Sequence, residues 1–219
     1  MSVTLRESSF FEGAVDTGLV DIAGGVATIV LAICGLTGIH PPLLASIATI
    51  VFGGALVAQG GMVLSGLSIA ARDGSVGVGE IGGYGGSVAI LLLAGLGGVI
   101  LGILALLGLN PTVLTAVSVI SYGGALVLSS GAGWALHVRT RESERRPGAP
   151  KMTGGYPSAE SVQTIAGFTV LVLGILGLVM GPANKLSLIL ASLLILGAAL
   201  SITGGGLGAV AQNLMRHIE

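Results

Sequence analysis

The chain has 219 residues, of which 53% are hydrophobic and only 9% are charged, and its mean hydropathy is +0.99. A soluble domain carries about 25% charged residues, so this composition excludes an ordinary soluble protein and predicts an integral membrane protein. The formal net charge of -1 leaves no basic face for nucleic acid. The single cysteine, Cys34, cannot form a disulfide within the chain.

Six apolar segments follow one another along the chain, each long enough to cross the hydrocarbon core as a helix of about 20 residues. They are predicted at residues 18–38, 43–70, 87–109, 112–137, 162–181 and 186–213. Runs such as Ala89 to Ala94 do not alternate apolar and polar residues, as the strands of a membrane β-barrel would. The predicted fold class is therefore all-α, a polytopic membrane protein. No cleavable signal peptide is evident in the first residues, so the first helix is expected to direct targeting.

The connections between these segments are of two kinds. Three are short turns with almost no charge, TGIHPP, LNPT and GPANK, in which proline ends one helix and suits the first turn of the next. These turns divide the chain into three helical hairpins, predicted at 18–70, 87–137 and 162–213. The remaining segments are an N-terminal segment (1–17), a loop (71–86), a basic loop (138–161) and a tail (214–219).

The charges can be placed almost entirely on one side of the membrane. All ten acidic residues and eight of the nine basic ones fit this side, and only Lys185 falls outside. By the positive-inside rule, both termini and the two long loops are predicted to be cytoplasmic. The segment from Arg139 to Lys151 is the strongest anchor of this orientation. We interpret it as a solvated loop that sets topology, with docking of lipid or a partner as the alternative.

The hairpins resemble one another in sequence. An ungapped alignment of residues 40–57 with 110–127 has eight identical positions of eighteen, against about two expected by chance from the composition. The alignment of 110–127 with 184–201 has six identities. Each hairpin starts and ends on the same side, so the sequence predicts three parallel repeats rather than inverted ones.

Glycine makes up 39 of the 219 residues and recurs at matched positions of the second helix of each hairpin. In lipid, small residues allow helices to approach closely. The predicted packing positions are Gly53, Gly54, Gly60, Gly61, Gly123, Gly124, Gly131, Gly197 and Gly204. Several are seven residues apart, nearly two turns, and so share one helix face. We expect the even-numbered helices to pack on one another or on the odd helix of the next hairpin. The alternatives are a stripe that faces another subunit or a narrow pore, or glycine that only fills space.

Asp21 and Gln59 are the candidates for handling a proton or a solute. Asp21 lies about one turn inside the first segment, where a carboxylate either sits at the headgroup level or serves a proton, a cation or a neighbouring helix end. Gln59 lies near the middle of segment 43–70, and its repeat equivalents are Ser129 and Thr203. Three polar groups at one depth would form a ring if the hairpins surround an axis.

No catalytic residue is predicted, since no nucleophile–base pair, metal-ligand spacing or phosphate-binding motif is evident. His137 and His217 lie at the same end of the fourth and sixth segments, which makes them weak candidates for ligation of haem or chlorophyll. Capping of helix C-termini is the simpler interpretation. No cofactor and no metal site are therefore expected.

The repeated pattern of apolar helix, glycine, short proline-bearing turn and glycine-rich apolar helix resembles the HdeD-like family of bacterial membrane proteins. The segments that carry this resemblance are GLTGIHPPLLASIATIVFGGALVAQGG, LLGLNPTVLTAVSVISYGGALVLSSG and, more weakly, GLVMGPANKLSLILASLLILGAAL. The resemblance covers residues 18–213 and implies a six-helix protein of the bacterial inner membrane that is linked with acid or envelope stress. It carries no catalytic residues.

The sequence therefore predicts a non-enzymatic inner-membrane protein that acts through packing and assembly, as a homo-oligomer or within a larger membrane complex in the lipid bilayer. One alternative is a channel or carrier for protons or small solutes, which would use Asp21 and the Gln59 layer. The other alternative is a subunit of a haem- or chlorophyll-containing complex.

Overall fold

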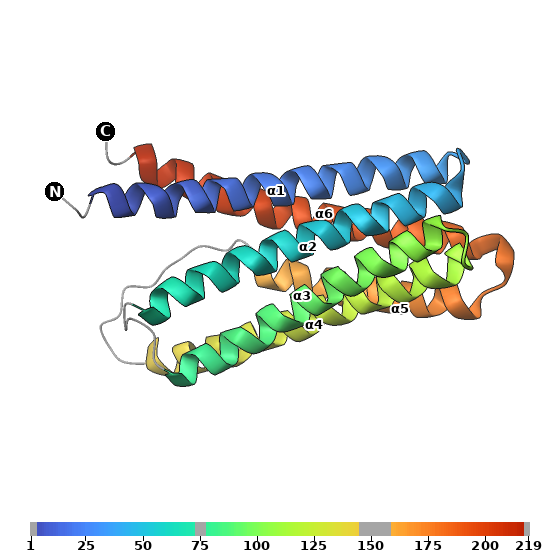
Figure 1. Ribbon diagram of the computed structural model, residues 1–219. Helices are drawn as coiled ribbons and strands as arrows, with labels where there is room; N and C mark the ends of the chain where they lie inside the picture. The colour runs from blue at the N-terminus through green and yellow to red at the C-terminus, as the bar shows by residue number, and fades with distance from the viewer. Residues whose placement is uncertain (1–3, 73–77, 145–158, 217–219) are drawn as a thin grey trace.

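The computed structural model describes residues 4–72, 78–144 and 159–216, and this part of the chain forms six α-helices (Figure 1). They are α1 (Thr4–Leu36), α2 (Pro41–Arg72), α3 (Val78–Leu106), α4 (Pro111–Glu144), α5 (Ala159–Val179) and α6 (Pro182–Arg216). No strand occurs within the described ranges. Each helix contains a stretch that is long and apolar enough to cross a membrane. These findings confirm the prediction of an all-α, multi-pass membrane protein.

The helices extend beyond the predicted segments at the charged end. Helix α1 begins at Thr4 rather than at residue 18, α3 begins at Val78 inside the predicted loop, and α4 continues to Glu144. Hydropathy marks where a helix lies in lipid, whereas the backbone hydrogen-bond ladder continues wherever the residues favour it. The helical boundaries at this end therefore do not coincide with the apolar boundaries.

At the other end, α1 and α3 stop two to three residues before the predicted limit because glycine ends them. Gly38 and Gly108 have φ angles of 93° and 85°, a conformation that side chains with a Cβ rarely adopt. His40 and Asn110, which align in the repeat, are also left-handed, with φ angles of 42° and 48°. The next residue in both hairpins is a proline that opens the following helix, and Pro182 opens α6 in the same way.

Helices α2, α4 and α6 form the inside of the bundle, and α1, α3 and α5 cover them. In their membrane-spanning stretches, 44–50% of the residues of the even helices are buried, against 28% in each odd helix. The three even helices also contact one another. In Figure 1 both termini lie at one end of the bundle, and the three tight turns lie at the other.

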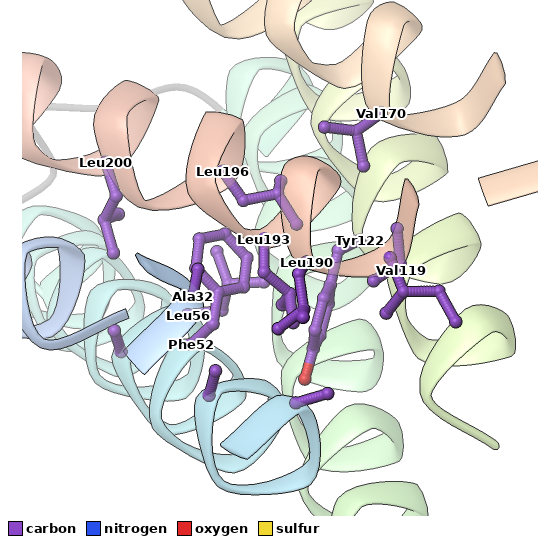
Figure 2. Close-up of a cluster of buried hydrophobic side chains, with 14 of the residues drawn as sticks. Ala32, Phe52, Leu56, Val119, Tyr122, Val170, Leu190, Leu193, Leu196 and Leu200 are labelled. Carbon is purple, nitrogen blue, oxygen red and sulfur yellow. The ribbon is translucent and has the colours of Figure 1, made fainter. Parts of the chain in front are cut away.

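Large apolar side chains from the three inner helices fill the centre. Phe52 of α2 and Tyr122 of α4 are buried with ring centroids 4.9 Å apart, and Leu193 of α6 is fully buried beside them (Figure 2). The Tyr122 hydroxyl donates a hydrogen bond of 2.7 Å to the carbonyl oxygen of Thr49. The centre of the bundle is thus packed solid at this level.

The outer surface is apolar, as a protein in lipid requires. Leu93, Phe168 and Val179 of the odd helices are 71%, 62% and 80% exposed. In water, such a continuous apolar face would be a large unfavourable patch, whereas lipid tails solvate it. The exposed residues therefore agree with the composition in placing the bundle in a bilayer.

Candidate functional site around Asp21

Three pairs of glycines bring each even helix into backbone contact with an odd helix of a neighbouring hairpin. A methyl group on one glycine of a pair would lie within 3 Å of the carbonyl oxygen of the other, in both directions. The pairs are Gly53–Gly95 between α2 and α3, Gly123–Gly167 between α4 and α5, and Gly197–Gly25 between α6 and α1. Close packing of the even helix on the odd helix of the next hairpin, with the third hairpin closing onto the first, agrees with the expectation from glycine spacing.

The glycines singled out from sequence fall into two groups. Gly60 packs on Leu92, and Gly204 packs on α1, so these two join the three members of the pairs as contact positions. Gly54 and Gly61 are exposed, with no atom within 4 Å of the position that a Cβ would occupy, and Gly124 meets only Leu171 at 4.0 Å. The side chain position of Gly131 lies outside the described part. The partner glycines on the odd helices were not singled out from the sequence, although each has another glycine seven residues away: Gly18/Gly25, Gly95/Gly102 and Gly167/Gly174.

Asp21 lies at the α1/α6 interface with none of its surface exposed. A methyl group on Gly204 of α6 would lie 2.8 Å from the Cβ of Asp21 and 2.9 Å from the carbonyl oxygen of Gly18. Only glycine permits this approach, which presses α6 against the base of the aspartate. Asp21 therefore points into the bundle rather than outward to the headgroups.

Neither carboxylate oxygen of Asp21 has a hydrogen-bond partner among the described residues. Burial of an ionised carboxylate in apolar surroundings costs about several kcal/mol of free energy unless the charge is paired. A charged residue inside a membrane helix is by default a functional hypothesis for this reason. Among the described residues, Asp21 is thus the side chain whose burial is least compensated by hydrogen bonds or ion pairs.

Gln59 of α2 lies near Asp21 in depth. Helices α1 and α2 run antiparallel, and a methyl group on Gly24 would lie 2.8 Å from the Cβ of Ala55. One turn further toward the termini, this register places Asp21 of α1 and Gln59 of α2 at a similar depth. The Oε1 atom of Gln59 is buried and has no hydrogen-bond partner within the described ranges. Two helices therefore bring unpartnered oxygens to one level.

These groups lie in the half of the bundle on the side of the termini. At 1.5 Å per residue, the stretch from Asp21 to Leu36 is about 22 Å long, and the stretch from Pro41 to Gln59 is about 27 Å long. The hydrocarbon core is about 30 Å thick. The apolar stretch of α2 within the described residues runs from Pro41 to Met62, so Gln59 lies toward its end on the side of the termini.

The hydroxyl groups at the equivalent repeat positions are satisfied locally. Thr203 is buried and donates to the carbonyl oxygens of Ala199 and Leu200 on its own helix, and Ser129 donates to that of Leu126. Gln59 therefore differs from both, since its amide oxygen is left without a donor. Gln59 and Asp21 thus share a similar depth, and the three repeat positions do not form a ring of unpaired groups.

Of the three histidines, only His40 has a described side chain. His40 is exposed in the turn before α2. His137 is on α4, but its side chain and the whole of His217 lie outside the described residues, so the interpretation as haem or chlorophyll ligands stays untested. Within the part of the chain that the structure describes, no group of three or more histidine, cysteine or acidic side chains is placed to hold a metal ion.

Comparison of the chain with protein-family models, with curated proteins and with solved structures finds no match. The class of the protein is thus defined by its own fold and site. It is a multi-pass helical membrane protein with a carboxylate buried between two of its helices.

Proposed function

We propose that this protein is a non-enzymatic membrane protein that binds a proton or a small cation at Asp21. The observation that carries the proposal is the complete burial of the Asp21 carboxylate with both oxygens unpartnered. Either a proton or a cation would remove the cost of the buried charge. The solid centre around Phe52, Tyr122 and Leu193 argues against an open pore along the bundle axis. Binding, or transport by conformational change, is therefore favoured over channel conduction.

The proposal includes the arrangement in the membrane. Three parallel hairpin repeats are supported by the sequence alignment and by glycine pairs at the same position of each even helix. The basic residues favour cytoplasmic termini by the positive-inside rule. A bacterial inner membrane, and a role in acid stress, follow from the HdeD-like resemblance alone. A carboxyl group that takes up a proton would suit such a role.

Infrared difference spectroscopy of the purified protein, titrated from neutral to acidic pH, tests the proposal. The expected result is a carboxyl band that belongs to a buried group and disappears in the Asp21→Asn variant. Asp16→Asn is the matched control, since this second aspartate of α1 should leave that band unchanged. Spectra that are identical for the wild type and Asp21→Asn, in the absence and presence of added cations, would remove the proposal.

Assembly is a second candidate, favoured by the exposed glycines of α2. Gly54 and Gly61 are seven residues apart and leave open space at the surface, where a helix of another copy or of a membrane partner would pack closely. Mass measurement in native-like nanodiscs tests this candidate. Wild-type oligomers should dissociate on Gly54→Leu and Gly61→Leu substitution, whereas a wild-type monomer would exclude self-assembly. The absorption spectrum of the same sample tests the haem or chlorophyll alternative.

A further inference from the structure

We infer that Asp21 and Gln59 together form an oxygen-only site for a monovalent cation of the size of sodium, for which a proton competes. The inference rests on the proposed function and names the second ligand and the class of ion. Its starting point is that, among the described residues, the buried side-chain oxygens without a hydrogen-bond partner are Oδ1 and Oδ2 of Asp21 and Oε1 of Gln59. Carboxylate and amide oxygens are the ligands that hard cations prefer.

The backbone contacts of α1 hold the two side chains in register. Gly24 packs on Ala55 of α2 on one side of α1, and Gly204 of α6 packs on the Cβ of Asp21 on the other. Both contacts are too close for any residue larger than glycine at these positions. Helix α1 is thus fixed between α2 and α6, and the depth of Asp21 relative to Gln59 cannot drift by a turn. Such fixed spacing is what a preorganised ion site requires.

The charge of the surroundings selects the valence of the ion. Helix α2 has no charged residue before Arg72, and α6 has none between Lys185 and Arg216. Along α1 the other charged residues, Arg6, Glu7, Glu12 and Asp16, all precede Asp21 toward the N-terminus. No positive group of the packed helices is therefore close in sequence to the site. One monovalent cation neutralises the single carboxylate, whereas a divalent ion would leave a net charge in apolar surroundings.

A proton is a competitor rather than an equivalent occupant. A protonated Asp21 has one O–H, which can donate to Gln59 Oε1 and so satisfy the amide oxygen. A cation instead coordinates the amide oxygen and the carboxylate at once. Removal of the amide oxygen should therefore weaken cation binding far more than proton binding, and this difference distinguishes a cation site from a proton site.

The experiment measures binding of radioactive sodium to the full-length protein in nanodiscs, in buffer with choline as the only other cation. Wild type should bind sodium in a manner that acid pH suppresses. Gln59→Met, which keeps the size but removes the oxygen, should lower the affinity about tenfold or more. Ser129→Ala, at the equivalent repeat position, should leave sodium binding unchanged. Gln59→Glu, which keeps an oxygen and adds charge, should bind calcium in the same assay where wild type does not.

The outcomes separate the inference from the proposed function. Equal sodium binding by wild type and Gln59→Met, lost only in Asp21→Asn, would overturn the role of Gln59 and leave the function at Asp21. No sodium binding by wild type, with a pH-dependent Asp21 carboxyl band, would overturn the cation and leave a proton site. Gln59→Glu reports independently if Gln59→Met fails to fold: a folded Gln59→Glu without calcium binding would also contradict the inference.

Discussion

The α1/α6 and α2/α3 interfaces have the same kind of glycine–glycine backbone contact. They differ in the polarity of the side chain one turn before the glycine of the odd helix. Gly25 meets Gly197 in the first, and Gly95 meets Gly53 in the second. Four residues before the odd-helix glycine, α1 has Asp21 and α3 has Leu91. Leu91 packs against the apolar core, whereas Asp21 is buried without a hydrogen-bond partner in the described part of the chain.

The difference separates what holds the bundle together from what gives it a site. Both interfaces are closed by glycine, so close packing does not need the aspartate. A leucine at the corresponding place in α3 shows that an apolar residue fits this geometry. The carboxylate of Asp21 is therefore an addition to the packing scheme that is unfavourable for stability.

The largest effect is expected for Gly197→Val. The new side chain would enter the space of the Gly25 carbonyl oxygen, 2.7 Å from the first added carbon, and a backbone cannot move aside as a side chain can. The free energy of unfolding, measured in detergent, should fall by about 3 kcal/mol or more. Gly54→Val is the matched control, because open space surrounds Gly54. Similar losses for both variants would mean that the glycine pairs are not the basis of helix packing.

Leu91→Asp should have the second-largest effect. It should lower the free energy of unfolding by about 3 kcal/mol, the cost of a charge in the interior of a membrane helix. It places a carboxylate in the α2/α3 interface, at the level where Gly60 packs on Leu92. Leu91→Asn, which adds polarity without charge, is the control and should lose less. A Leu91→Asp protein as stable as wild type would show that both interfaces tolerate a carboxylate equally.

Asp21→Leu should change stability in the opposite direction. Replacement of a buried, unpaired carboxylate by an apolar side chain is expected to raise the free energy of unfolding by about 1–2 kcal/mol in buffer that lacks small cations. Thermal unfolding of the two proteins checks the sign, with Asp16→Leu as the comparison. If Asp21→Leu is instead less stable than wild type without cations, the carboxylate has a structural partner and the two interfaces do not differ as described.

Tyr122→Phe should lower the free energy of unfolding the least, by about 1 kcal/mol, because it removes one buried hydrogen bond between helices. The hydroxyl donates to the Thr49 carbonyl oxygen and lies against Gly53 and Gly98, which ties α4 to the α2/α3 interface. Ser121→Ala is the control, since the Ser121 hydroxyl is exposed and bonds only its own helix. A loss no larger than that of the control would mean that the Tyr122 contact stabilises little.

Hydropathy and turn residues predicted the class and most of the architecture because both are local properties. Proline at 41, 111 and 182 opens a helix as expected. The glycine spacing gave Gly53, Gly123 and Gly197 as contact positions, but it could not distinguish them from Gly54. Adjacent residues of a helix face directions about 100° apart, so only one of two neighbouring glycines meets a given partner. Which one does so depends on the neighbour.

The candidate site was predicted in part. Asp21 and Gln59 stood out individually because ionisable and amide side chains are rare in such apolar segments. Their similar depth was not predictable, since it depends on how far α1 and α2 slide past each other. The register is set by the Gly24–Ala55 contact and by Gly204 against Asp21. The expected ring requires the polar groups of Gln59, Ser129 and Thr203 to face one another. The hydroxyls of Ser129 and Thr203 instead donate to carbonyl oxygens of their own helices.

By itself, the sequence determined that the chain lives in a bilayer, that six helices cross it, and that tight turns join them in pairs. Each of these follows from the free energy of transfer of local segments or from backbone preferences at glycine and proline. Only the tertiary structure decided that α6 closes onto α1, that Phe52, Tyr122 and Leu193 fill the centre at their level, and that the oxygens of Asp21 and Gln59 are buried without a partner among the described residues. Those features depend on contacts between segments far apart in the chain, which van der Waals packing selects only when all six helices are in place.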